Sequence, residues 1–94
     1  MREEKIYTRH PEGKKGVHIL KRRYDTISNY ILETLRIENE ITFRELSVRA
    51  IQDLSKTFDG KVAWYIVTEK LDLEARGIIE RIPKSTPQKI RLKK

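Results

Sequence analysis

Side chains that commonly do chemistry are few and scattered in this sequence. His10 and His18 lie near the start without a second nitrogen or sulfur ligand at the spacing of a metal site, and the chain has no Cys. No serine belongs to a nucleophile motif, and the carboxylates form no pair that would raise one pKa beside another. Gly13 and Gly16 are not followed by the sequence of a phosphate-binding loop. We therefore expect no enzyme activity, no metal site and no cofactor.

The basic residues show the clearest pattern, and the chemistry they indicate is the binding of a polyanion. The net charge of +7 divides into +5 for residues 1–24, −4 for residues 25–80 and +6 for residues 81–94. A positive field attracts nucleic acid above all, although anionic membranes and acidic proteins respond to it too. The two ends of the chain are therefore the candidate binding segments.

The N-terminal segment, residues 1–23, is predicted to be a basic arm. Ile6–Thr8 and Val17–Leu20 have strand character, and the intervening Pro11–Gly13 favours a turn, so the arm can form a β-hairpin. The alternative is a solvated, partly disordered arm, because few large apolar groups are available to anchor it. Both interpretations stay open at the level of sequence.

Two amphipathic helices follow the arm. Over residues 24–36 the apolar positions recur at three- and four-residue spacing, which predicts a helix with Asp25 as a cap. Ile41 is predicted to be a short strand. Over residues 42–54, Thr42 and Glu45 have the spacing of a capping box, in which each side chain binds the other residue's backbone N–H.

The third helix, residues 61–76, is apolar over most of its circumference and is predicted to be the central buried helix, with Asp59 as its N-cap. Trp64 is assigned to its core side. The predicted exposed arc consists of Lys61, Tyr65, Thr68, Glu69, Asp72 and Arg76. Gly77 then ends the helix, and residues 78–82 and 88–92 read as strands joined by a turn at 83–87.

This order of elements resembles the winged helix-turn-helix superfamily. The resemblance is strongest at the junction between the third helix and the following strand, Leu71-Asp72-Leu73-Glu74-Ala75-Arg76-Gly77-Ile78-Ile79-Glu80-Arg81. The resemblance implies an α+β fold. Its winged-helix domain covers residues 24–94 and consists of a three-helix core and a C-terminal β-hairpin wing, and the basic arm of residues 1–23 precedes it. More narrowly, the chain is similar to a small bacterial family of unknown function. Three segments carry this similarity: His10-Pro11-Glu12-Gly13-Lys14-Lys15-Gly16, residues 70–77 and residues 83–88.

Winged-helix geometry would place the third helix in the major groove of DNA and the wing over adjacent phosphates. The candidate contacts are Arg81, Lys84, Ser85, Thr86, Lys89 and Arg91 on the wing, Lys61, Tyr65 and Thr68 on the helix, and Lys14, Lys15, Arg22 and Arg23 on the arm. Six phosphate contacts by the wing would give a log–log salt slope of about −5. The alternative for the wing is a solvated edge hairpin whose lysines prevent aggregation.

The function predicted from the sequence is thus binding of duplex DNA, with a possible role in transcription. The alternative is a winged-helix module that binds a protein partner, since this fold also serves in assembly. RNA binding is a weaker variant, because no aromatic stacking platform is evident. A homodimer is possible. No stretch approaches the length of a membrane span, so we expect a cytoplasmic protein without membrane contact.

Overall fold

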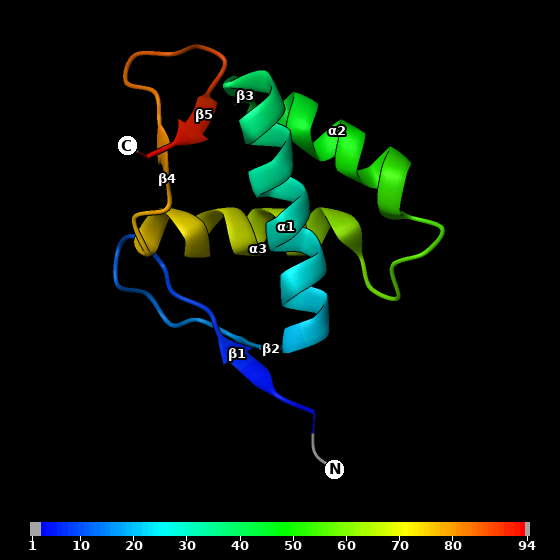
Figure 1. The fold of residues 1–94 in the computed structure, drawn as a ribbon. Helices are drawn as coiled ribbons and strands as arrows, with labels where there is room; N and C mark the ends of the chain where they lie inside the picture. Colours follow the sequence, from blue (N-terminus) through cyan, green and yellow to red (C-terminus); the bar gives the residue numbers. More distant parts are fainter. Residues whose placement is uncertain (1–2, 94) are drawn as a thin grey trace.

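The protein is described by a computed structural model that covers residues 3–93 (Figure 1). Three helices and five short strands form an α+β fold with two small antiparallel sheets. In chain order they are β1 (Lys5–Tyr7), β2 (His18–Leu20), α1 (Lys21–Glu38), β3 (Glu40–Thr42), α2 (Phe43–Leu54), α3 (Val62–Ala75), β4 (Ile79–Arg81) and β5 (Lys89–Leu92). From α1 onward, this order is compatible with a winged-helix arrangement. Within residues 3–93, none of the helices is both long and apolar enough to cross a membrane.

The core lies where α1 and α2 pack on α3, and Figure 1 shows α1 crossing in front of α3. Ile27, Ile31 and Leu35 form one fully buried stripe of α1, as their spacing predicts. Ile66 and Leu73 of α3 meet them from the other side. Burial of such side chains contributes about 1.5–3 kcal/mol each relative to exposure, so these contacts fix how the helices cross.

The three-stranded sheet, ordered β3-β5-β4, closes one end of the core. Ile41 of β3 pairs with Ile90 of β5, and Ile90 also pairs with Arg81 of β4. Ile90 and Ile79 are fully buried. The predicted strand at Ile41 is therefore present and pairs with the C-terminal hairpin, β4–β5.

The N-terminal segment forms a β-hairpin, as one of the two interpretations of the sequence predicted. Ile6 pairs with Ile19, which is buried. Beyond the strands, the loop narrows at Gly16, where an added Cβ would lie 1.7 Å from the carbonyl oxygen of Thr8. The hairpin is attached to α3 by the backbone N–H of Arg9, which donates to Asp72 Oδ1 over 2.8 Å. We call residues 8–17 the hairpin loop.

The start of α1 differs from the prediction. The helix begins at Lys21, directly after β2, so the predicted boundary at residue 23 falls inside it, and Arg22 and Arg23 belong to its first turn. Asp25 does not cap the helix. Its carboxylate accepts from Lys21 Nζ over 2.6 Å, one helical turn away.

The caps of the other two helices also need correction. Thr42 Oγ1 accepts from the N–H of Glu45 over 3.1 Å, but the Glu45 carboxylate binds Arg49, so only half of the capping box forms. Asp59 does not cap α3. Lys61 occupies the N-cap position without a side-chain hydrogen bond, and the carboxylate of Asp59 is bound by Arg22 and Arg23 of α1. Past the end of α3, Gly77 has φ 75°, as its position predicted.

Candidate nucleic-acid interface

The outward face of α3 is not the one that the sequence predicted. Trp64 and Val67 are 47% and 46% exposed, whereas Glu69 and Asp72, predicted to be exposed, are fully buried. Tyr65 is half-buried and packs against the core. The assignment of Trp64 to the core was therefore wrong. The helix turns its acidic groups inward because α1 and the N-terminal hairpin cover that side and supply partners for Asp72.

Asp72 is bound from three directions. Its carboxylate accepts from the backbone N–H of Arg9 (2.8 Å), from the Tyr24 hydroxyl and from Arg76 Nε (2.9 Å). Burial and the hydrogen bond to Asp72 raise the pKa of the Tyr24 hydroxyl above its usual range. These groups join α1, α3 and the hairpin, so Asp72 is unavailable to a ligand, and Arg76, which is partly exposed, is already bound to Asp72.

Glu69 lies beside this cluster and has no hydrogen-bond partner for either carboxylate oxygen among the described residues. Burial, followed by the neighbouring charges of Asp72 and Asp25, raises the pKa of Glu69 to about 9. The side chain is therefore protonated at neutral pH. In this neutral form Glu69 does not repel phosphates.

A hollow of about 210 Å³ lies between the hairpin loop and α3. We call it the Trp64 hollow. Its lining residues are Thr8, Arg9, His10, Lys15, Gly16, Val17, Trp64, Thr68 and Leu71. The Trp64 ring contacts Tyr65 edge-on, with centroids 4.9 Å apart, and the Tyr65 hydroxyl accepts from Arg23 over 3.1 Å. Three residues at α3 were predicted to contact DNA. Thr68 lines this hollow and Lys61 is exposed, whereas Tyr65 packs on the core and binds Arg23.

The cations predicted on the wing mostly meet carboxylates. Arg81 pairs with Glu74 (3.1 Å), Lys89 with Glu40 (3.2 Å) and Arg91 with Glu80 (2.8 Å). Hence these three cations of the basic run are locally neutralised by carboxylates of α3, β3 and β4. The pairs of Lys89 and Arg91 are largely exposed and worth little stability, whereas Arg81 binds a Glu74 side chain that is nearly buried. Each of these pairs competes with a phosphate for its cation.

The turn of the C-terminal hairpin retains two exposed candidates, Lys84 and Thr86. Within residues 3–93, Lys84 forms no ion pair. Ser85 is engaged inside the turn: its hydroxyl donates to the carbonyl of Ile82 over 2.7 Å and accepts from the N–H of Lys89 over 3.0 Å. Lys84 is therefore the cation of this hairpin best placed for an anionic ligand.

Among the predicted cations of the N-terminal arm, some are paired with carboxylates within residues 3–93 and one is not. Asp59 binds Arg22 over 2.9 Å and Arg23 over 3.0 Å, and the two guanidinium groups hold the pKa of Asp59 well below its usual range. Lys14 pairs with Glu12 over 3.4 Å in the exposed loop. Lys15 is exposed, and it has no ion pair in the part of the chain that the structure describes.

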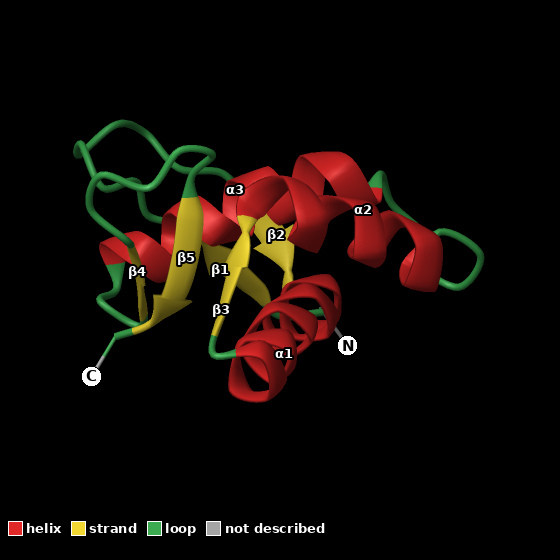
Figure 2. Cartoon of the chain, turned by 90° about the horizontal axis from the view of Figure 1, so that it is seen from above, coloured by secondary structure: helices red, strands yellow, loops and turns green. Residues whose placement is uncertain are grey.

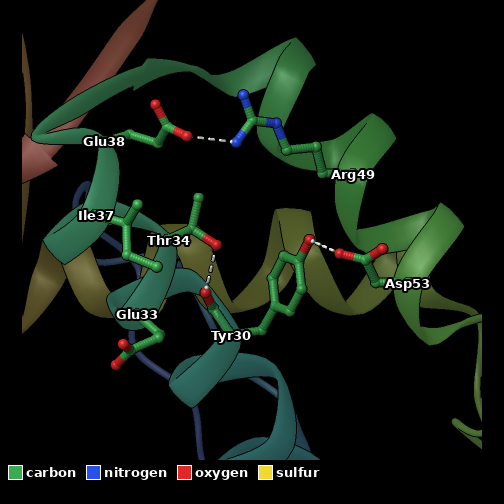
Figure 3. Close-up of a pocket in the computed structure, with 7 residues that line it drawn as sticks. All are labelled: Tyr30, Glu33, Thr34, Ile37, Glu38, Arg49 and Asp53. Atoms are coloured by element: carbon green, nitrogen blue, oxygen red, sulfur yellow. Dashed lines mark hydrogen bonds and ion pairs between the residues drawn. The ribbon is translucent and has the colours of Figure 1, made fainter.

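A second hollow, of about 290 Å³, lies between α1 and α2 (Figure 3). Its lining residues are Tyr30, Glu33, Thr34, Ile37, Glu38, Arg49 and Asp53. In it, Tyr30 donates to Asp53 over 2.6 Å and Arg49 pairs with Glu38 over 2.7 Å. Burial and the bond to Asp53 raise the pKa of Tyr30 to about 12. Three carboxylates against one guanidinium make this hollow unsuitable for a polyanion, and no sequence motif marked it.

The fold and these surfaces define a small α+β protein in which a hairpin loop and an apolar helix face enclose a hollow with basic side chains. Residues 5–90 match a family of unknown function, DUF6958, and the chain belongs to this family. No curated protein and no solved structure matches the chain.

Proposed function

We propose that the chain is a winged-helix protein that binds nucleic acid, chiefly duplex DNA, through contacts to the phosphate backbone. The observation that carries the proposal is the placement of three exposed lysines without a carboxylate partner within residues 3–93. Lys15 belongs to the hairpin loop, Lys61 precedes α3, and Lys84 belongs to the turn of the C-terminal hairpin. In Figure 2 this turn and the hairpin loop lie toward the end of α3 that leads into β4. The three lysines thus lie toward the two ends of the helix that winged-helix proteins present to DNA.

The proposed binding tolerates many sequences, because the outward face of α3 offers few groups that read base edges. Trp64 and Val67 dominate that face, and among its polar groups Thr68 is only partly exposed. Three phosphate contacts correspond to a log–log salt slope of about −3, at roughly 0.9 for each phosphate. This is weaker than the slope of about −5 that six wing contacts would give.

Fluorescence anisotropy with a labelled random duplex, titrated at several salt concentrations, tests the proposal. Lys84→Ala should lower the magnitude of the slope by about 1. Arg91→Ala is the matched control on the same hairpin, and it should lower the slope less because Glu80 already holds the guanidinium. Absence of binding at low salt and micromolar protein would refute the proposal, as would a larger effect of Arg91→Ala.

A second candidate function, binding of a protein partner, is favoured by the apolar character of the same face. Trp64 and Val67 are three residues apart on α3 and both nearly half exposed, and exposed tryptophans often anchor protein interfaces. A pull-down whose partner stays bound at high salt, together with no binding to the random duplex, would favour this function.

A further inference from the structure

We propose that the Trp64 hollow holds one unpaired nucleobase stacked on the Trp64 ring, so that the protein binds single-stranded or frayed nucleic acid in addition to backbone contacts with duplex. The inference rests on the proposed function only in that the ligand is a nucleic acid. It also revises the expectation from sequence, which found no aromatic stacking platform because Trp64 was assigned to the core.

The walls of the hollow supply the apolar contacts that a base requires. Trp64 is 47% exposed, and its edge-on contact with Tyr65 fixes the orientation of the indole. Val17 is exposed on the hairpin loop and Leu71 is half-buried on α3. A volume of about 210 Å³ accommodates a single base and is too small for a base pair. Stacking on an aromatic side chain is the usual way in which proteins hold unpaired bases.

The polar groups of the hollow suit a nucleotide and disfavour a cationic ligand. Arg9 and Lys15 provide positive charge for a phosphate, and the hydroxyl of Thr68 can donate to or accept from a base edge. No carboxylate is among the lining residues. Asp72, a buried carboxylate of the same helix, is bound by the Arg9 N–H and by Arg76, so the lining of the hollow favours an anion.

The hairpin loop is held in place without the ligand. The N–H of Thr8 donates to the carbonyl of Val17 over 2.9 Å, and the N–H of Val17 donates to Thr8 Oγ1 over 2.9 Å. The N–H of Gly16 donates to the Tyr7 hydroxyl over 3.1 Å. Because Thr8 and Gly16 approach so closely that no Cβ fits, the wall facing Trp64 is formed in advance, which lowers the entropic cost of binding.

Trp64 is the only tryptophan of the chain, so its fluorescence reports the site directly. We expect a short oligothymidylate to quench this emission and a blunt-ended duplex of equal length to leave it nearly unchanged. Stacking of one base is worth about 1–3 kcal/mol. Trp64→Leu should therefore weaken oligothymidylate binding about fivefold to 150-fold, measured by anisotropy of the labelled strand.

Two further variants separate stacking from general effects. Trp64→Phe keeps an aromatic ring and should restore most of the affinity that Trp64→Leu loses. Val67→Ala alters an equally exposed side chain of α3 that does not line the hollow, and should bind the oligonucleotide like the unmodified protein. Circular dichroism of each variant checks that the fold is retained.

The outcomes distinguish this inference from the proposed function. If the duplex binds with the expected effect of Lys84→Ala, but Trp64→Leu binds the oligothymidylate like the unmodified protein, the base site is refuted and the duplex proposal stands. Equal quenching by single strand and duplex also refutes the base site. If neither nucleic acid binds, both proposals fail, and quenching of Trp64 by an acidic peptide would assign the hollow to a protein partner.

Discussion

Replacing Glu69 by Gln should stabilise the protein at neutral and alkaline pH. Glu69 is fully buried on α3, and neither carboxylate oxygen has a hydrogen-bond partner among residues 3–93. An ionised carboxylate in such a place is strongly unfavourable, so the group stays protonated. Gln has nearly the same volume and is neutral at every pH, so the substitution removes the ionisation without opening a cavity.

The size of the effect follows from the pKa of Glu69, which burial raises from an ordinary value of 4.5 to about 9. Below pH 4.5 the side chain is protonated in the folded and unfolded chains alike, and ionisation costs no stability. Between pH 4.5 and about 9 only the unfolded chain loses the proton, so the free energy of unfolding falls by about 1.4 kcal/mol for each unit of rising pH. At pH 7 the accumulated cost is about 3 kcal/mol.

Urea unfolding of both proteins from pH 4 to pH 9, followed by circular dichroism, measures the difference in the free energy of unfolding. The curves for Glu69→Gln and the unmodified protein should coincide near pH 4.5 and separate to about 3 kcal/mol at pH 7. Glu33→Gln, at an exposed position of α1, is the control and should show no such separation. Parallel curves for Glu69→Gln across the whole range would refute the reasoning.

Two substitutions test how the N-terminal hairpin is held. Gly16→Ala places a Cβ 1.7 Å from the carbonyl oxygen of Thr8, so we expect the free energy of unfolding to fall by about 1–3 kcal/mol. Hydrogen exchange should become faster at the Thr8 N–H, which donates to the carbonyl of Val17. Unchanged exchange would contradict the close approach of Gly16 and Thr8. Tyr24→Phe removes the hydroxyl that donates to the buried carboxylate of Asp72, and should lower the free energy of unfolding by about 2 kcal/mol in urea titrations. A loss below about 0.5 kcal/mol would show that Asp72 does not depend on this bond.

The sequence predicted the elements better than it predicted their faces. The stripe of Ile27, Ile31 and Leu35 defined the buried side of α1 because polar residues fill the rest of that helix. In α3 the apolar residues surround most of the helix, so several rotations satisfy the pattern equally well. The predicted rotation turned the narrow polar arc outward, because charged side chains are seldom buried, and this led to the wrong positions for Trp64 and Asp72.

The partners that reverse this rule are distant in the sequence. Asp72 is buried because Tyr24 and Arg9 reach it from α1 and the hairpin, 48 and 63 residues away. Similarly, the segment from Arg81 onward contains no acidic residue, yet Glu40 of β3 meets Lys89 across the sheet, at a separation of 49 residues. Local charge counts describe the composition of a segment but not the field at its surface, which depends on such pairings.

The position of Asp72 links the fold to the proposed function. In a base-reading helix-turn-helix protein, the polar groups of the recognition helix face the DNA. In this protein Asp72 faces the interior and binds the hairpin. Arg76, which is partly exposed, binds Asp72 and the carbonyl of Tyr7. The hairpin loop in turn forms one wall of the Trp64 hollow. Groups that could have read base edges thus position the hairpin loop, the proposed second binding element. It follows that selectivity among nucleic acids should respond to changes in the hairpin loop more than to changes in the polar residues of α3.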